Sequence, residues 1–339
     1  SVALGLHGHR ICGIDVDRKK IQSFRKGVPP IYEVGMQENL RKLIETNQID
    51  FFDDISVIDN CSIIMIAVGT PASADGKADL SYVETVARQI GQHLRKKTVI
   101  VVKSTVPIGT CDGIKQIIED EQKKRGVFIP FAVVSNPEFL REGRALHDAL
   151  YPERIVIGCS SEWAKEKMKE LYANFSTQML FTTIRDSEMI KYASNAFLAT
   201  KISFVNELAR LTEKIGANIT EVTKGMGLDS RIGDKFLHAG IGYGGSCFPK
   251  DTEALLAIGE ETGVNQALLQ AVKQVNVSQV QWFCEKITTL IGDAKNKKIA
   301  LLGLTFKPDT DDIREAPALQ ILHYFLNKEA VISTYDPKG

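Results

Sequence analysis

Short apolar runs alternate with amphipathic segments through the first half of the chain. The apolar runs are five to nine residues long, as is typical of buried parallel strands, and they cover 62–70, 98–105, 131–135, 154–159 and 178–183. Between them, segments 81–96, 112–125 and 162–174 carry apolar residues at helical spacing. Ser81 and Glu84 have the spacing of a capping box for the first of these helices. This alternation predicts an α/β fold with a Rossmann-like, doubly wound parallel sheet.

The first residues predict part of a dinucleotide-binding motif, with the end of a helix at 1–6, a strand at 10–15 and a helix at 17–27. In such a motif an acid at the end of the second strand binds the adenosine ribose, and Asp15 has that position. The glycine-rich phosphate turn is expected roughly 20 residues before this acid. Only 14 residues precede Asp15 and none forms that turn, so we expect the printed sequence to lack the first strand and its phosphate loop.

The predicted strands end in polar residues. Asp15, Thr70, Thr105 and Glu138 each stand at or just beyond the carboxyl end of a strand. Ligands of open α/β sheets bind at that edge, so we expect a nucleotide site there.

The hydrophobic period changes at Ser187. Apolar residues then recur every three or four positions from Ile190 to Ile215, and Gly216 ends the pattern. The predicted helix of about 28 residues is about 42 Å long, so we expect two domains or two subunits to share it. Residues 217–294 continue as helices apart from a glycine-rich stretch at 240–252.

A second α/β pattern closes the chain, with strands at 298–306 and 331–335 around a helix at 316–327. One strand–helix–strand unit cannot cover its own faces, so we expect this domain to be cut short where the printed sequence ends. The patterns divide the chain into a first α/β domain (1–186), a central helical domain (187–294) and the start of a C-terminal α/β domain (295–339).

Composition narrows the choice of partners. Lys plus Arg and Asp plus Glu number 42 each, so neither a nucleic-acid face nor another polyanion partner is indicated. The apolar runs are too short to cross a membrane. The six cysteines are far apart, which argues against a metal site or a disulfide framework and favours a reducing, cytoplasmic location: 12, 61, 111, 159, 247 and 284.

The glycine-rich stretch GIGYGGSCFPKDT (240–252) is the strongest candidate for chemistry. Its glycines allow the backbone to lie close to a ligand, and Cys247 follows directly on the bend. Lys250 favours a thiolate, and Asp251 can steer or deprotonate a water. The alternative is a glycine-rich turn with a buried, inert cysteine.

Two i,i+4 pairs are further candidates. Glu138 and Glu142 would share one face of a helical turn, and close carboxylates suit acid–base work. Lys191 and Asn195 would stand on the polar side of the long helix, where an ammonium and an amide can stabilise an oxyanion. Taken alone, each pair is more often an ordinary solvated helix face.

Seven stretches carry a wider resemblance: PIYEVGM (30–36), VGTPASADGKADLSYV (68–83), KSTVPIGT (103–110), SNPEFLREG (135–143), KYASNAFLATK (191–201), GLDSRIGDKFLHAGIGYGGSCFPKDT (227–252) and FKPDTDDIREAP (306–317). In these the chain resembles the nucleotide-sugar dehydrogenases of the UDP-glucose/GDP-mannose dehydrogenase family. GGSCFPKDT with KFLHAG before it is most similar to the UDP-glucose branch, and the GDP-mannose branch is the nearer alternative.

The resemblance implies that the sixth carbon of the sugar in UDP-glucose is oxidised and that two molecules of NAD each accept a hydride. Cys247 would trap the aldehyde as a thiohemiacetal, which is oxidised to a thioester and hydrolysed. The resemblance also implies the roles of the other catalytic residues. Lys191 and Asn195 would stabilise oxyanions, Asp251 and Thr105 would position water and take protons, and Glu138 would assist hydrolysis.

Binding residues follow from the same resemblance. Those implied for NAD are Asp15 and Lys20 at the ribose, Glu142 near the nicotinamide, and Val68, Thr70, Ser104, Thr105, Lys250 and Arg314 along the cofactor. Those implied for the sugar nucleotide are Glu138, Phe139, Leu140, Lys191, Asn195, Arg231, Lys235, His238, Tyr243, Gly244, Phe306 and Lys307. Arg231 matches a residue that reaches across a dimer interface, so we expect a homodimer or a larger homo-oligomer. Phe139, Leu140 and Phe306 would equally suit a core, and His238 a surface.

Two other classes of function remain open. A cysteine-dependent acyl transferase or hydrolase would use Cys247 without nicotinamide, but Asp15 and the parallel-sheet edge argue against it. A nucleotide-sugar sensor would bind without turnover, although the chain contains Cys247, Lys191, Asn195 and Asp251 together.

Overall fold

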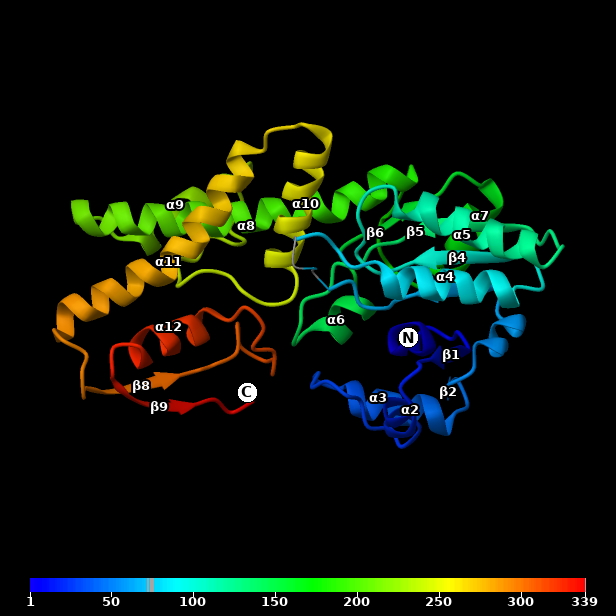
Figure 1. Ribbon diagram of the computed structural model, residues 1–339, viewed down its shortest axis with the longest axis horizontal. Helices are drawn as coiled ribbons and strands as arrows, with labels where there is room; N and C mark the ends of the chain where they lie inside the picture. Colours follow the sequence, from blue (N-terminus) through cyan, green and yellow to red (C-terminus); the bar gives the residue numbers. More distant parts are fainter. Residues whose placement is uncertain (72, 74–75, 339) are drawn as a thin grey trace. The chain divides into compact units, whose positions relative to one another are not determined.

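The computed structural model describes residues 1–71, 73 and 76–338 (Figure 1). Residues 72, 74 and 75 of the matching stretch 68–83, and Gly339, lie outside the described residues. The chain divides into two compact units, Ser1–Ser73 with Ala78–Lys191 and Tyr192–Gly339 with Ala74–Lys77.

The first unit contains two sheets of short strands. β1 (Ile11–Ile14) pairs in parallel with β2 (Ile49–Phe52), and α1 (Val2–Leu6), α2 (Arg18–Arg25) and α3 (Met36–Glu45) belong to this part of the unit. The second sheet has the order β3-β4-β5-β6-β7. Its strands are β3 (Ile63–Ile66), β4 (Thr98–Val102), β5 (Phe131–Ser135), β6 (Ile155–Gly158) and β7 (Met179–Thr182). Neighbours run parallel except β5 and β6, which meet in a single antiparallel pair, Ser135 with Gly158.

Helices cover both faces of the second sheet. Ile100 and Val102 of β4 pack with apolar residues of α4 (Ser81–His93) and α5 (Thr110–Lys124). Val99 and Val101, which point to the opposite face, pack with residues of α7 (Glu162–Leu171). Burial on both faces explains why the sequence of β4 is apolar without alternation. Two short elements complete the unit, the 3-10 helix η1 (Ile55–Asn60) and α6 (Ala145–Leu150).

The second unit is mostly helical. α8 (Ile184–Ile215) begins in the first unit and continues into the second, where α9 (Ile219–Gly227), α10 (Phe248–Thr262) and α11 (Ala267–Ile291) follow it. The parallel strands β8 (Lys298–Leu302) and β9 (Val331–Tyr335) and helix α12 (Pro317–Leu326) come last (Figure 1). Ile321 and Phe325 of α12 join Val280 and Cys284 of α11 in one apolar cluster, so this last segment shares its core with α11.

The α/β class, the parallel strands and the long helix are confirmed. α8 has 32 residues and is therefore about 48 Å long, because it starts at Ile184 rather than at Ser187. The capping box is wrong. Leu80 is the N-cap residue and Ser81 is the first residue inside α4, where its N–H donates to Asp79 Oδ1 at 2.9 Å.

Candidate functional site

Polar side chains join the loops that follow β3 and β4 in the first unit. Thr70 Oγ1 donates to the carbonyl of Thr105 at 2.8 Å, and Ser104 Oγ donates to the carbonyl of Val68 at 2.6 Å. The four residues implied for the cofactor at this edge therefore lie together, at the carboxyl ends of two parallel strands.

Asp15 follows the carboxyl end of β1. Its Oδ1 accepts the N–H of Asp17 at 2.9 Å, and its Oδ2 lies 3.9 Å from Lys20 Nζ. The Asp15 side chain is 35% exposed, so the carboxylate has lone pairs available to ribose hydroxyls. These residues fit the adenosine end of NAD.

Glu138 and Lys191 form a partly buried ion pair in the first unit. Lys191 Nζ lies 2.9 Å from Glu138 Oε1, with side chains 4% and 24% exposed respectively. Glu138 Oε2 accepts the N–H of Leu140 at 2.5 Å. The ring of Phe139 lies beside two cations, 4.2 Å from Arg154 Cζ and 5.5 Å from Lys191 Nζ.

The helical turn expected to align Glu138 with Glu142 is wrong. Residues 136–144 have no helical structure, and α6 starts only at Ala145. Pro137 and Gly143, which has a positive φ of 77°, keep the two carboxylates in an irregular loop.

Lys103 forms hydrogen bonds with the first two residues of that loop and was not among the predicted residues. Its Nζ lies 3.3 Å from Asn136 Oδ1 and 3.2 Å from the carbonyl of Pro137. Burial lowers the pKa of Lys103 to about 8, with Lys191 acting in the same direction and Glu138 opposing. The clue in the sequence was its place in KSTVPIGT, directly before Ser104 and Thr105.

Cys247 is the N-cap residue of α10 in the second unit, with Pro249 in the first turn. Its side chain is half-buried, and Ser246 Oγ lies 3.6 Å from its Sγ. The N-terminus of a helix carries a partial positive charge, which favours a thiolate at this position.

Asp251, one turn further along α10, accepts two strong hydrogen bonds. Asn195 Nδ2 donates to its Oδ2 and Lys250 Nζ to its Oδ1, both at 2.6 Å. The Asp251 side chain is 1% exposed and that of Lys250 19%. Three of the predicted residues therefore form one buried network, in which Lys250 has a carboxylate as its partner.

The remaining predicted residues of the second unit lie in loops. Arg231 pairs with Asp229, and Arg314 pairs with Asp312, with N–O distances of 2.6 and 2.7 Å. Lys307 Nζ lies 5.4 Å from the ring of Phe306. Lys235 and His238 are exposed, whereas Tyr243 is buried and burial raises its pKa.

Gly244 and Gly245 pack closely against the segment 306–317. A Cβ on Gly244 would overlap the carbonyl of Glu315, and one on Gly245 would lie 2.7 Å from the ring of Phe306. The N–H of Gly245 donates to the carbonyl of Arg314 at 2.9 Å. Only glycine permits this approach, which brings the loop of Cys247 against residues implied for nucleotide binding.

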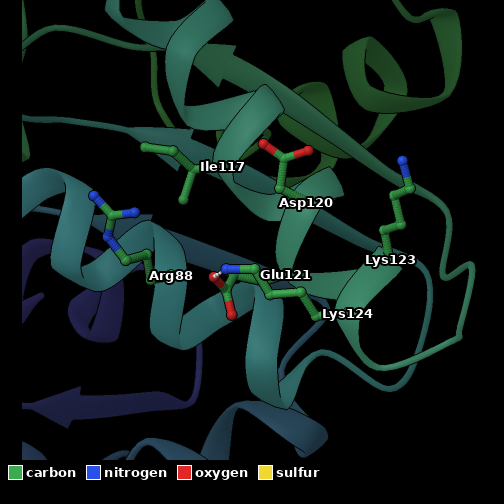
Figure 2. Close-up of a pocket in the computed structure, with 6 residues that line it drawn as sticks. All are labelled: Arg88, Ile117, Asp120, Glu121, Lys123 and Lys124. Atoms are coloured by element: carbon green, nitrogen blue, oxygen red, sulfur yellow. Dashed lines mark hydrogen bonds and ion pairs between the residues drawn. The ribbon is translucent and has the colours of Figure 1, made fainter.

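A charged hollow on α4 and α5 lies apart from these residues. Figure 2 shows its lining, which contains none of the predicted site residues: Arg88, Ile117, Asp120, Glu121, Lys123 and Lys124. Glu121 is satisfied there by Gln92 at 2.9 Å and Lys124 at 2.6 Å, so the hollow is an ordinary charged surface.

Family sequence models match all three parts of the chain. The NAD binding domain of the UDP-glucose/GDP-mannose dehydrogenase family matches residues 1–176, its central domain 185–278 and its UDP binding domain 300–339. The chain belongs to this family. As a member of the UDP-glucose/GDP-mannose dehydrogenase family it is an NAD-dependent oxidoreductase, which agrees with the strand-edge site described above.

Individual relatives agree with this assignment. UDP-glucose 6-dehydrogenase TuaD of Bacillus subtilis is 47% identical over 331 residues, which are 97% of this chain and 71% of the relative. UDP-glucose 6-dehydrogenase of Rhizobium meliloti is 45% identical over 98% of this chain and 77% of its own length. The structure of a UDP-glucose dehydrogenase from Pyrobaculum islandicum is similar with a TM-score of 0.95 and 39% identity, over 99% of this chain and 78% of that one.

Two further observations concern the described residues. No group of three or more His, Cys, Asp or Glu side chains among them could hold a metal ion. Within residues 1–71, 73 and 76–338, no helix is long and apolar enough to span a membrane.

Proposed function

We propose that this enzyme oxidises UDP-glucose to UDP-glucuronate and that Cys247 holds the sugar covalently between two oxidation steps. The observation that carries the proposal is the position of Cys247 at the N-terminus of α10, in the stretch GGSCFPKDT. Two relatives that are 45% and 47% identical are named UDP-glucose 6-dehydrogenases, which favours UDP-glucose over GDP-mannose.

The chemistry balances with two NAD and one water per sugar. The alcohol on the sixth carbon loses a hydride to the first NAD and a proton to a base, which leaves an aldehyde. The Cys247 thiolate adds to the aldehyde carbon, and the resulting thiohemiacetal loses its hydride to the second NAD to become a thioester. Water then splits the thioester, releasing the carboxylate and restoring the thiol.

The side chains described above suit distinct roles in this sequence. The Lys191 ammonium and the Asn195 amide would stabilise the oxyanions. Asp251 and Thr105 would position water and take protons, and Glu138 would assist the hydrolysis of the thioester. NAD supplies the hydride acceptor, with Asp15 and Lys20 at its ribose and Val68, Thr70, Ser104, Lys250 and Arg314 along it; Glu142 would lie near the nicotinamide.

The substrate's nucleotide and sugar would be held by residues of several loops and of α8. Two of them, Phe306 and Lys307, belong to the segment that packs against Gly245. The full set we propose is Glu138, Phe139, Leu140, Lys191, Asn195, Arg231, Lys235, His238, Tyr243, Gly244, Phe306 and Lys307.

A homodimer completes the proposal. Phe197, Phe204 and Leu211 follow one another at intervals of seven residues on α8 and are 65%, 51% and 54% exposed. This spacing places them in one stripe, which a second copy of α8 would bury, with Arg231 contributed across the interface. No disulfide joins cysteines among the described residues, which suits a reducing compartment, so we place the enzyme in the cytoplasm.

The test is the amount of NADH formed per UDP-glucose consumed, for the wild type and for Cys247→Ala. Two NADH per sugar, with no complete turnover by the variant, is the expected result. One NADH per sugar would contradict the covalent mechanism. Two NADH with GDP-mannose and none with UDP-glucose would change the substrate, and binding without NADH would favour a sensor.

A further inference from the structure

Side-chain amides hold the loop that leads to Cys247. Asn276 Oδ1 accepts the N–H of Tyr243 at 2.8 Å, and its Nδ2 donates to the carbonyl of Tyr243 at 3.1 Å. Three residues earlier in the chain, two other side-chain amides bind the main-chain groups of Gly240. Its N–H donates to Asn206 Oδ1 at 2.7 Å and its carbonyl accepts from Gln279 Nε2 at 2.7 Å. We call Asn206 of α8 and Asn276 and Gln279 of α11 the amide clamp.

Two of the three clamp amides are buried. Asn206 is 0% exposed and Gln279 is 3% exposed, whereas Asn276 is half-buried. Arg210 Nε donates to Gln279 Oε1 at 2.7 Å, which fixes the amide so that its Nε2 faces the loop.

The loop also needs glycine to reach the clamp. Gly242 has a φ of 108°, and a Cβ at this position would lie 3.0 Å from Asn276 Oδ1. Further along the loop, the N–H of Gly245 donates to the carbonyl of Arg314. The backbone is therefore held at Gly240, Tyr243 and Gly245, the last of these only two residues before Cys247.

We propose that the amide clamp, and Asn276 above all, positions the Cys247 thiol for attack on the aldehyde. The inference rests on the proposed function, because it concerns the step in which sulfur and carbon form a bond. Such a step needs the two atoms aligned at about 3–3.5 Å, and a displacement of about 1 Å can cost about 100-fold in rate. The first hydride transfer does not involve the thiol, so displacement of the thiol slows the later steps of the reaction and not this first step. Asn276 is thus a positioning residue.

The test compares Asn276→Ala and Asn276→Asp with the wild type and with Gln281→Ala. Gln281 is a matched control because it is an exposed amide on the same helix, bonded to Glu285 of that helix at 2.8 Å. Each protein is assayed with UDP-glucose and NAD for kcat, KM and NADH per sugar, and hydroxylamine is added to trap released aldehyde.

Asn276→Ala is expected to lower the kcat for formation of UDP-glucuronate about 100-fold with KM changed less than about threefold. It is also expected to release aldehyde and to lower the ratio from two NADH per sugar toward one. Asn276→Asp keeps an acceptor for the N–H of Tyr243 and loses the donor, so its kcat falls between those of Asn276→Ala and the wild type. Gln281→Ala behaves as the wild type.

Two results overturn the positioning role alone. One is an Asn276→Ala enzyme with wild-type kcat and two NADH per sugar. The other, which decides the matter if Asn276→Ala does not fold, is a folded Asn276→Asp enzyme that has wild-type kcat and releases no aldehyde. A wild-type ratio of one NADH per sugar overturns the proposed function, and the positioning role with it.

Discussion

Removing the carboxylate of Asp251 is expected to destabilise the second unit strongly. The carboxylate is 1% exposed and accepts from Lys250 and Asn195, both at 2.6 Å. In Asp251→Leu both donors lose their acceptor, and the ammonium of Lys250 is left largely buried. Breaking such a buried pair from one side costs about 3–5 kcal/mol in the free energy of unfolding.

The same geometry predicts a coupling between the two charges. Lys250→Met leaves the Asp251 carboxylate buried with only the amide of Asn195, which is also expected to cost about 3 kcal/mol or more. The double variant leaves no uncompensated charge, so its cost falls below the sum of the two single costs by about 1–3 kcal/mol. Activity is lost in all three variants, because none keeps both polar groups.

The two tryptophans of the chain allow each unit to be followed separately. Trp163 lies on α7 in the first unit and Trp282 on α11 in the second, so Trp163→Phe leaves one fluorescent reporter for the unit that contains Asp251. The midpoint temperature of unfolding should then fall by about 6–20 °C in Asp251→Leu, since a loss of about 1 kcal/mol lowers it by about 2–4 °C for units near this size.

An exposed pair in the first unit, followed by Trp163 in a Trp282→Phe background, provides the comparison. Arg88 and Glu84 on α4 lie 2.9 Å apart, but their side chains are 51% and 46% exposed, so Glu84→Gln is expected to cost less than about 1 kcal/mol. The reasoning is refuted if Asp251→Leu costs no more than Glu84→Gln, or if the coupling with Lys250 is below about 0.5 kcal/mol.

Three further predictions concern the first unit and are read from Trp163 in a Trp282→Phe background. Gly91→Ala places a Cβ 2.7 Å from that of Glu121 and 3.1 Å from the backbone of Ile118, so it should lower the free energy of unfolding by about 1–3 kcal/mol. Gly113 faces open space, so Gly113→Ala should raise the free energy of unfolding by about 0.5–1 kcal/mol. Equal effects of the two substitutions would contradict the close packing of α4 on α5. The pKa of Lys103 is about 8 in the folded chain and about 10.5 in the unfolded chain. Between these pH values the unfolded chain binds more protons, so the free energy of unfolding of the wild type should rise relative to that of Lys103→Met by up to about 1.4 kcal/mol per pH unit. A difference between the two proteins that does not change with pH would show that the pKa is not lowered. Glu188 accepts the N–H groups of Gly109 and Cys111 at the start of α5, at 2.7 and 3.0 Å. Glu188→Gln should therefore lower the free energy of unfolding by about 1–2 kcal/mol, and a loss below about 0.3 kcal/mol would mean that this cap contributes little.

Elements with a strong local pattern were predictable from the sequence. The strands at 131–135 and 331–335 were predicted to the residue, because polar or turn-forming neighbours bound short β-branched runs. α3, β2 and α6 were missed. The four residues of β2 and the six of α6 are too few to show a period, and their burial depends on partners distant in the chain, as in the pairing of Ile11 with Ile49.

The candidate site was predictable as a set of residues and not as a set of contacts. Glu138 and Lys191 are 53 positions apart and Asn195 and Asp251 are 56 apart, so no local spacing indicates that each pair is bonded. Lys250 was expected to act on the cysteine, and the structure pairs it with Asp251. Asn276 gives no signal at all in the sequence, because a lone amide on a helix is usually solvated.

The hydrogen bonds described along the loop before Cys247 run to main-chain atoms at Gly240, Tyr243 and Gly245. Main-chain N–H and C=O groups are the same for every amino acid except proline, so the path of the loop does not encode which side chain stands at position 247. A single codon change there can alter the chemistry while the loop is inherited intact. If Cys247 acts as proposed, one substitution after gene duplication would turn such a catalyst into a binding protein. Under the proposed mechanism, the residue at 247 is a better guide to turnover among relatives than the shape of the loop.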